Sequence, residues 1–360
     1  LSCALRNCRS EISFIWHPLM KILVTGNLGY VGTTTTEYLK NQGYEVVGLD
    51  SGFYRECLLV PLENKIITKN KDIRDVEISD FAGIDAVVHL AALSNDPIGE
   101  LDQNLTHEIN YLGAVRTAEM AKRAGVEKFI FVSTQSIYGI SSSSDELDED
   151  NSIKNPQTAY ASSKWRAEQE ILAMSDSSFI STALRPSTVF GWSPRLRSDI
   201  VFNNLLLTGL KQQRIDVHSD GTPWRPIVHV LDLARAIEVC IKSDSERISG
   251  RSFNIGVLNG NFTVKQLAEA ARECLNRIPI AFKTEHIVDP RSYKVSFERA
   301  RKELGFTAKV GLLAGGAEIV LESKKLIGQG IDLMDRKTNR LLQMKFLLEN
   351  GLIDGSLRFK

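Results

Sequence analysis

The sequence predicts a doubly wound parallel α/β fold joined to a smaller, mixed α/β portion. Two observations lead to this prediction. Short apolar runs alternate with amphipathic helical stretches through the first half of the 360-residue chain, and a glycine-rich turn directly follows the first apolar run. Strands separated by helices pair in parallel, because the chain must cross over to begin each new strand in the same direction.

The expected elements of the first half follow one another without long gaps. Gly43 breaks the chain between the first helix and the second strand, and Pro156 stands where a helix would begin. Strands are expected at residues 21–25, 45–50, 66–68, 86–90, 128–133 and 181–185, and helices at residues 30–41, 105–124 and 156–174.

Beyond residue 185 the pattern is less regular, because four prolines interrupt it between residues 186 and 226. A strand is expected at residues 227–230, and helices at residues 200–210, 231–242 and 262–276. We expect Asp232 and Thr263 to cap the last two helices. After residue 306 the chain is typical of polar helices, with few residues that suggest chemistry.

The composition is that of a globular protein, with 43% hydrophobic and 24% charged residues. Lys+Arg and Asp+Glu both number 44, so neither nucleic acid nor an anionic membrane surface is an expected partner. No apolar run approaches the roughly 20 residues that span a bilayer. The five scattered cysteines form no close pair, which favours reduced thiols, a cytoplasmic location and no metal site.

The glycine-rich turn indicates a dinucleotide site. It follows a strand and opens a helix, the context that separates a phosphate-binding turn from an ordinary tight turn. Glycine lets the backbone approach a pyrophosphate, and the free N–H groups of the helix N-terminus favour its negative charge. The residues expected to contact the cofactor here are Gly26, Asn27, Leu28, Gly29, Tyr30, Val31 and Gly32.

Asp50, at the end of the second expected strand, favours NAD over NADP. A carboxylate about 20 residues past the glycines accepts hydrogen bonds from the ribose hydroxyls and would repel a 2′-phosphate. A solvated loop acid is the plainer interpretation, and Arg55 leaves NADP as an alternative. Asp72 and Ile73 follow the third strand and are expected near the adenine, although a turn residue is an equally good interpretation of Asp72.

Tyr160 and Lys164 are one helical turn apart, so they lie on the same face of the expected helix at residues 156–174. A phenol loses its proton near pH 10 in water, and a neighbouring ammonium lowers that value. Thr134 ends the fifth expected strand, at the sheet edge where ligands bind. A hydroxyl there can hold the substrate oxygen and pass its proton to Tyr160. A surface Tyr–Lys pair is the alternative.

Several motifs together resemble the extended short-chain dehydrogenases/reductases, in the branch of NAD-dependent nucleotide-sugar epimerases and dehydratases. The resemblance covers residues 21–306. Besides the glycine turn and the Tyr160/Lys164 pair, the motifs are His89-Leu90-Ala91-Ala92, Ser133-Thr134-Gln135-Ser136-Ile137-Tyr138-Gly139, Arg185-Pro186 and Arg225-Pro226-Ile227-Val228-His229.

The resemblance implies a role for particular residues. Thr134, Tyr160 and Lys164 would be the catalytic trio. The further cofactor-binding residues would be Leu90, Ala91, Ala92 and Pro186, together with Tyr160 and Lys164. The substrate, a nucleotide-diphosphate sugar, would be bound by Ser94, Thr134, Asn203, Asn204, Arg225 and Arg291. Each guanidinium can bind a diphosphate bidentately, although surface ion pairing is the alternative for both arginines.

One departure from the family pattern narrows the chemistry. In the sugar 4,6-dehydratases of this family an Asp and a Glu follow the catalytic Thr, whereas this chain has Gln135 and Ser136. Neither exchanges a proton near neutral pH, so dehydration by that route is disfavoured, and epimerisation or simple oxidation or reduction is favoured. A nucleotide-sugar reductase or oxidase, a dehydratase, and a non-catalytic NAD-sensing protein remain the alternatives. His89 and His229 are expected to be structural.

The domain organisation follows from these assignments. Met20 directly precedes the first strand, so residues 1–19 are expected to be a leader outside the fold, with a genuine amino-terminal arm as the alternative. Residues 20–184 with 222–258 would form the NAD-binding Rossmann domain, residues 185–221 with 259–330 the substrate domain, and residues 331–360 a helical tail. The resemblance also implies a homodimer through the helices at residues 105–124 and 156–174.

Overall fold

The structure, a computed structural model, describes residues 20–94, 96–141, 145–282 and 292–360. The expected leader and Arg291 lie outside the described residues, so the predictions for them stay predictions. In the described part of the chain, no helix combines the length and the apolar character that crossing a membrane requires.

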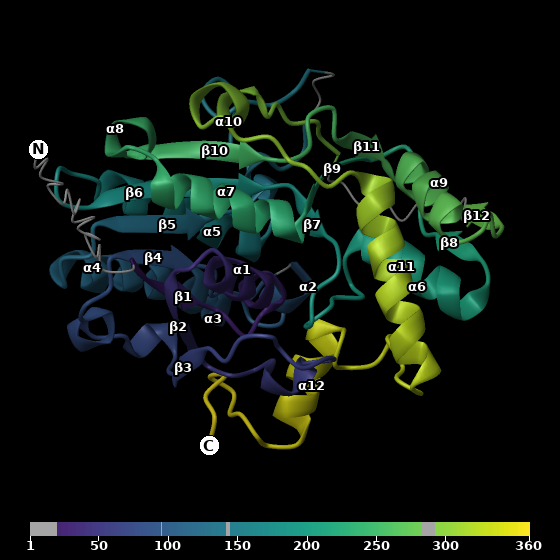
Figure 1. Cartoon of the computed structure of the whole chain (residues 1–360), viewed down its shortest axis with the longest axis horizontal. Coiled ribbons are helices and arrows are strands. Elements are labelled where there is room, and N and C mark those ends of the chain that lie inside the picture. Colours follow the sequence, from purple (N-terminus) through teal and green to yellow (C-terminus); the bar gives the residue numbers. More distant parts are fainter. Residues whose placement is uncertain (1–19, 95, 142–144, 283–291) are drawn as a thin grey trace, which may run out of the picture.

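A seven-stranded sheet forms the centre of the larger portion (Figure 1). Every pair of neighbouring strands in it is parallel, and the order is β10-β6-β5-β4-β1-β2-β3. This confirms the doubly wound fold. The strands are β1 (Lys21–Thr25), β2 (Glu45–Asp50), β3 (Ile67–Asn70), β4 (Ala86–His89), β5 (Lys128–Val132), β6 (Ile180–Pro186) and β10 (Arg251–Ile255).

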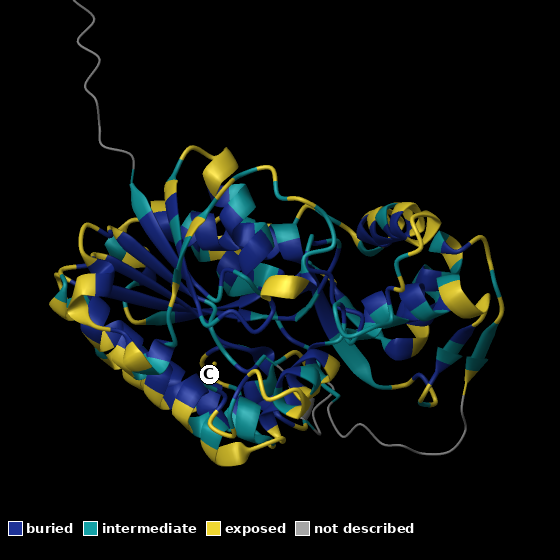
Figure 2. Cartoon of the chain, turned by 90° about the horizontal axis from the view of Figure 1, so that it is seen from below, coloured by how far each residue is buried: buried dark blue, intermediate teal, exposed yellow. Residues whose placement is uncertain are grey.

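Helices cover both faces of this sheet because its strands are apolar on both faces. Ile22 and Val24 pack in one core cluster with α1 (Tyr30–Asn41) and α7 (Val230–Lys242), whereas Leu23 packs in the other with α4 (Ala114–Arg123) and α5 (Ala159–Ala173). Alternate residues of a strand point to opposite faces, which explains the division. Figure 2 shows buried strands between helices that expose only their outer sides.

The smaller portion is built on two short sheets and three helices that share a third core cluster. Its strands are ordered β11-β9-β7 and β12-β8. The strands are β7 (Thr188–Phe190), β8 (Ile215–Val217), β9 (Trp224–His229), β11 (Asn261–Thr263) and β12 (Ile280–Phe282), and the helices are α6 (Val201–Gln212), α9 (Val264–Cys274) and α11 (Leu312–Gly328).

Short helical segments complete the described chain. The expected helix at residues 105–124 is a continuous helical stretch that contains one π-helical turn, η4 (Glu108–Gly113), between α3 (Gln103–His107) and α4. The other segments are η1 (Arg55–Cys57), η2 (Ile73–Asp75), η3 (Ile78–Phe81), α2 (Asp96–Gly99), η5 (Gln135–Tyr138), α8 (Ser245–Ile248), α10 (Glu298–Glu303) and α12 (Arg340–Glu349).

Three local predictions are corrected or confirmed by the caps. The helix expected from Pro156 begins at Ala159, because the Thr158 side chain accepts the Ala161 N–H and caps it. Thr263 caps α9, as expected. Asp232 is not the cap of α7: His229 is, and the buried carboxylate of Asp232 accepts the N–H groups of residues 309 and 310. The sequence could not show that the backbone of residues 309 and 310 would lie beside the Asp232 carboxylate.

Residues 331–360 return to the Rossmann portion after α11. Figure 1 shows this yellow segment against the purple loops that follow β2. Met344 and Leu347 of α12, with Ile353 and Leu357, belong to the same core cluster as Leu23 of the central sheet. The segment is therefore packed against the sheet's helical layer, while the division of the chain into domains remains our proposal.

Candidate active site

A cavity of about 770 Å³ lies at the carboxyl ends of the parallel strands. Its wall is formed by the glycine turn, by residues that follow β2 to β6, by the segment from Arg197 to Leu205, by parts of β8 and β9, and by the start of α12. Ligands of open parallel sheets bind at this edge, and the volume is in the usual range for small-molecule sites.

The glycine turn leaves no space for a side chain at Gly26 or Gly32. Gly26 has φ +72°, and a Cβ added there would lie 2.7 Å from the Ala91 nitrogen. A Cβ on Gly32 would lie 2.1 Å from the Gly26 oxygen. No side chain caps α1, whose first turn lines the cavity. An uncapped helix N-terminus behind a glycine turn fits the pyrophosphate of a dinucleotide.

Two residues of the turn do not line the cavity. The Asn27 side chain is buried and donates to Thr68 Oγ1 at 2.8 Å, and it packs against the site of Gly48, where a Cβ would lie 2.3 Å away. Leu28 contributes its N–H, which donates to Asp50 Oδ2 at 3.0 Å. The other five predicted turn residues, Gly26, Gly29, Tyr30, Val31 and Gly32, line the cavity.

Asp50 lies at the end of β2, as expected, and lines the cavity. Burial raises the pKa of its carboxyl, while the N–H groups of Gly52 and Leu28, which donate to its two oxygens, act in the opposite direction. Each carboxylate oxygen still has capacity for a second hydrogen bond, which fits ribose hydroxyls. Arg55 donates to Asn70 Oδ1 at 2.8 Å.

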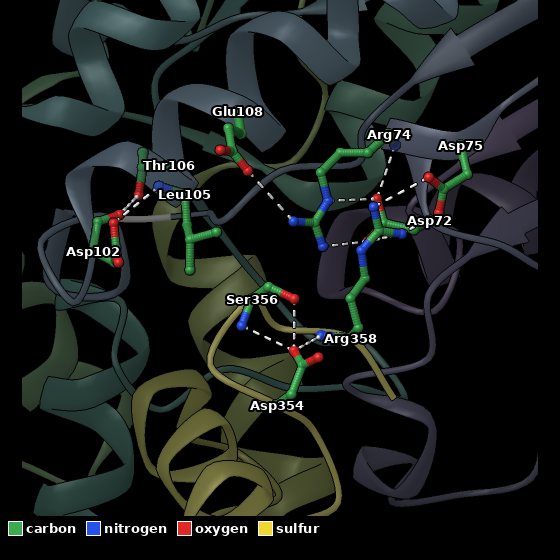
Figure 3. Close-up of polar contacts among 10 residues, drawn as sticks. All are labelled: Asp72, Arg74, Asp75, Asp102, Leu105, Thr106, Glu108, Asp354, Ser356 and Arg358. Atoms are coloured by element: carbon green, nitrogen blue, oxygen red, sulfur yellow. Dashed lines mark hydrogen bonds and ion pairs between the residues drawn. The ribbon is translucent and has the colours of Figure 1, made fainter. Parts of the chain in front are cut away.

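Asp72 and Ile73 line the same end of the cavity as Asp50. Asp72 caps η2 by accepting the Arg74 N–H at 2.8 Å, and its carboxylate also accepts from the Arg74 guanidinium at 3.1 and 2.7 Å (Figure 3). Asp72 is therefore a turn residue that also lines the cavity, and its expected place near the adenine stays a prediction.

Thr134, Tyr160 and Lys164 all line the cavity, from the carboxyl end of β5 and the first turns of α5. The Thr134 hydroxyl accepts the Ser136 N–H at 3.1 Å, which orients it and leaves its proton to donate. A Cβ on Gly99 would lie 3.2 Å from Tyr160 Cβ, so α2 packs closely onto the base of the phenol.

Lys164 is almost fully buried, with 2% of its surface exposed. Burial lowers its pKa to about 7, and the Glu168 carboxylate opposes that shift. Its Nζ lies 4.1 Å from the centroid of the Phe131 ring, where an ammonium is attracted to the ring face. Glu168 forms a buried ion pair with Arg185, with 2.6 Å between Oε1 and Nη2.

The remaining predicted residues divide into those that line the cavity and those that do not. Leu90, Ala91, Ala92, Ser94, Pro186, Asn204 and Arg225 line it. Asn203 does not: its amide accepts the Gly191 N–H at 3.2 Å and donates to the Arg197 carbonyl at 3.0 Å, which holds two loops together. Arg225 donates to the Trp224 carbonyl at 2.8 Å.

Gln135 and Ser136 also line the cavity, beside Thr134. The Gln135 amide is 1% exposed and donates to the Arg185 carbonyl at 3.0 Å. Neither side chain is an acid or a base, so the cavity holds a phenol and a hydroxyl at this place but no carboxylate from these two positions.

The sequence prediction missed several residues of the wall. Arg197 and Asp199 line the cavity as a bidentate ion pair, with nitrogen–oxygen distances of 2.9 and 2.8 Å. Asn339, Arg340 and Leu341 reach the cavity from α12 and the residue before it. The charged run at residues 195–199 was the one visible signal, whereas nothing in the local pattern indicates that α12 returns to β2.

A glycine turn after β1, a carboxylate at the end of β2, and a Tyr–Lys pair on the helix after β5 define a dinucleotide-dependent enzyme of the α/β class. The chain belongs to the NAD dependent epimerase/dehydratase family, whose model matches residues 22–256. It is an NAD-dependent enzyme of that family.

Individual relatives have different activities. The chain is 29% identical over 306 residues to a UDP-glucose 4-epimerase of Corynebacterium glutamicum, covering 80% of this chain and 91% of the relative. It is 26% identical to UDP-glucuronic acid decarboxylase 1 of Arabidopsis thaliana, covering 86% of this chain and 71% of the relative. A solved structure, MoeE5 in complex with UDP-glucuronic acid and NAD, is 28% identical with a TM-score of 0.73, covering 85% of this chain and 99% of the other.

Proposed function

We propose that the chain is an NAD-dependent epimerase that inverts one hydroxyl-bearing carbon, C4, of a nucleotide-diphosphate sugar. The observation that supports this most is the composition of the cavity wall: Thr134, Tyr160 and Lys164 line it together, while Gln135 and Ser136 occupy the two places beside Thr134. Such a site can move a proton on and off one hydroxyl oxygen. It has no acid or base at residues 135 and 136 to expel water from the neighbouring carbons.

The proton steps belong to the chain's own residues. Tyr160 would take the proton of the C4 hydroxyl, with the Thr134 hydroxyl holding the same oxygen. Lys164, when charged, favours the phenolate form of Tyr160, because an opposite charge on the same helix face stabilises an anion. NAD supplies, when bound, the acceptor and then the donor of the C4 hydride.

The second half of the reaction needs the sugar to present its other face. The sugar ring of the keto intermediate would rotate within the cavity, so that C4 presents its other face, while the nucleotide diphosphate stays bound. The hydride then returns to the opposite face, and Tyr160 returns the proton to the oxygen. We propose Ser94, Asn204 and Arg225 as substrate-binding residues, since all three line the cavity, and Arg291 as a further one by resemblance.

Product analysis on a panel of nucleotide sugars tests this function. UDP-glucose, UDP-galactose, UDP-glucuronic acid and dTDP-glucose would each be incubated with the NAD-loaded protein. An epimer of unchanged mass, with no net NADH, supports the proposal. Loss of water would indicate a dehydratase, loss of CO₂ a decarboxylase, and stoichiometric NADH or NAD⁺ an oxidase or reductase. Tight NAD binding without turnover on any member would favour the NAD-sensing alternative.

We also propose a cytoplasmic homodimer. Support for the dimer comes from the two helical stretches named above, which pack against one another on one face of the sheet and leave Leu112 48% exposed. Light scattering on the purified protein measures the oligomeric state, and a Leu112→Glu variant that stays dimeric would argue against this face.

A further inference from the structure

Residues 331–360, which we call the strap, are bound to both loops at one end of the cavity. That end is lined by Asp50, Asp72 and Ile73, and it is where the adenosine of NAD is expected.

Several side chains of the strap hold the first loop, which follows β2, and three of them contact Phe53 or Tyr54. Gln343 is 1% exposed and donates from Nε2 to the Phe53 carbonyl at 3.0 Å. The Arg340 guanidinium lies 4.7 Å from the centroid of the Tyr54 ring. The Phe359 ring stacks on Phe53, with 5.8 Å between the centroids. Phe53 and Tyr54 both line the cavity.

The second loop, which follows β3, is held by Arg358. This guanidinium pairs with Asp75, with 3.1 Å between Nη2 and Oδ1, and its Nη1 lies 3.6 Å from Asp72 Oδ2. Asp354 positions Arg358 by accepting its N–H at 2.9 Å (Figure 3). The ring contact and the ion pair come from neighbouring residues, so one short segment connects the β2 loop to the β3 loop.

The strap also supplies part of the cavity wall. Asn339, Arg340 and Leu341 line the cavity, and Arg340 is 1% exposed. Its guanidinium donates to the Arg195 carbonyl at 2.7 Å, while Arg195 donates to the Tyr54 carbonyl at 3.1 Å and to Thr33 of α1 at 2.9 Å. Movement of the strap would therefore loosen the β2 loop and one wall at the same time.

We propose that the strap retains NAD by holding the two loops together around its adenosine half, so that the cofactor stays bound through many turnovers. An epimerase regenerates its NAD in each cycle and has no need to exchange it. The benefit of keeping NAD bound rests on the proposed epimerase function. The retention itself depends only on where the adenosine of NAD binds. Arg340, Gln343 and Arg358 act as positioning residues.

The rate of NAD release tests the proposal without any sugar. The full-length Arg358→Ala/Phe359→Ala double variant removes the ion pair and the ring contact, both at the surface. We expect it to release NADH about tenfold faster than the unmodified protein, a change that corresponds to ~1.4 kcal/mol and falls mainly on the dissociation rate. The matched control is Arg301→Ala, which removes another exposed ion pair, to Glu298, at 2.8 Å in α10. It should release NADH at the unmodified rate.

Fragment binding separates retention from general loosening. The double variant should bind AMP about tenfold more weakly than the unmodified protein does. Its affinity for nicotinamide mononucleotide should equal that of the unmodified protein. Arg358→Lys, which keeps the charge but not the planar fork, should release NADH at an intermediate rate, and it serves as the test if the double variant does not fold. Unchanged release in the variant that folds, or equal weakening of both fragments, would overturn the proposal. Failure of all sugars to react would overturn the proposed function alone.

Discussion

The two ends of the cavity are built in different ways. At the reacting end, Thr134, Tyr160 and Lys164 come from one strand end and the first turns of one helix. At the adenosine end, the loops after β2 and β3 are held by a segment that is far away in sequence, since Gln343 and Phe53 are 290 residues apart. The residues proposed for the chemistry therefore lie on neighbouring elements of the chain, whereas the proposed hold on the cofactor needs a segment from the far end of the sequence to return to the sheet.

The charges at the two ends also differ in their surroundings. Lys164 is buried at a cost in desolvation, and the nearby Arg185–Glu168 pair is 3% and 0% exposed. Arg358 and Asp75 are 35% and 51% exposed, so their pair contributes about 0–1 kcal/mol and is screened by salt. Charges that shift the pKa of a neighbouring group act most strongly when they are buried away from water. An ion pair that only joins two loops can remain exposed to solvent.

The largest expected effect separates the reacting end from the adenosine end. Tyr160→Phe should lower kcat about 10²–10⁴-fold on the true substrate, because a positioned general base contributes that much. NAD affinity should stay nearly unchanged, since the ring is retained. Steady-state kinetics and NADH fluorescence titration measure the two quantities. Near-normal turnover would show that the base lies elsewhere in the cavity.

Gly32→Ala should act on the cofactor turn, which lies between the two ends. The new methyl group would lie 2.1 Å from the backbone oxygen of Gly26, so the turn must shift. We expect NAD affinity to fall about 100-fold, equivalent to ~3 kcal/mol of overpacking. Gly328→Ala is the control, because beyond the adjoining backbone of its own helix no atom lies within 4 Å of its Cβ position. An isothermal titration in which both variants bind NAD equally well would contradict the expected geometry.

Asp50→Asn should weaken the adenosine end and leave the chemistry intact. The amide replaces one acceptor by a donor that faces the N–H of Gly52 or Leu28, and the charge that repels a 2′-phosphate is lost. NAD affinity should fall about tenfold, the scale of one hydrogen bond to a charged group. The ratio of the affinity for NAD to that for NADP should become smaller. Saturated with NAD, the variant should turn over normally. A preference that is unchanged would assign cofactor choice to other residues.

The smallest expected effect is a pH-dependent gain in stability from Lys164→Met. The pKa of Lys164 is lowered from 10.5 to about 7 by burial, so between these values the unfolded chain binds a proton that the folded chain does not. The unmodified protein therefore gains stability as pH rises through this window, and below it carries the full cost of the buried charge.

The Met variant lacks that cost. Its melting temperature without cofactor should exceed the unmodified value by about 2–4 °C at pH 6, the scale of ~1 kcal/mol. The difference should shrink by pH 9. Thermal scans across that range measure it, and a difference that grew with pH would have the opposite sign to the one expected. The same variant should lose both NAD affinity and turnover, because the ammonium serves the phenol and the cofactor.

Much of the larger portion could be predicted from the sequence for a local physical reason. A strand that is buried on both faces needs a continuous apolar run, and residues 21–25 and 45–50 have one. A turn that admits no Cβ needs glycine, as at Gly26 and Gly32. Helical spacing alone brings Tyr160 and Lys164 to one face. Each of these features depends on residues a few positions apart.

The tertiary structure decided the features that depend on distant partners. Asp232 is a residue type that often caps helices, but its carboxylate accepts the N–H groups of residues 309 and 310, and His229 caps α7 instead. Asn203 and Asn204 are adjacent and equivalent in sequence, yet only Asn204 lines the cavity, because α6 turns them to different sides.

The strap shows the same limit most clearly. Residues 331–360 read as a polar helical tail, because the partners of buried side chains such as Met344 and Gln343 lie near the other end of the chain. What the sequence by itself determined is the fold class, which follows from the periodicity of the apolar residues. The catalytic residues follow from helical spacing and the family resemblance, and their role stays a prediction. Which segment lies against the loops after β2 and β3 was decided only on folding, when Phe359 met Phe53 and Arg358 met Asp75, about 300 positions apart in the sequence.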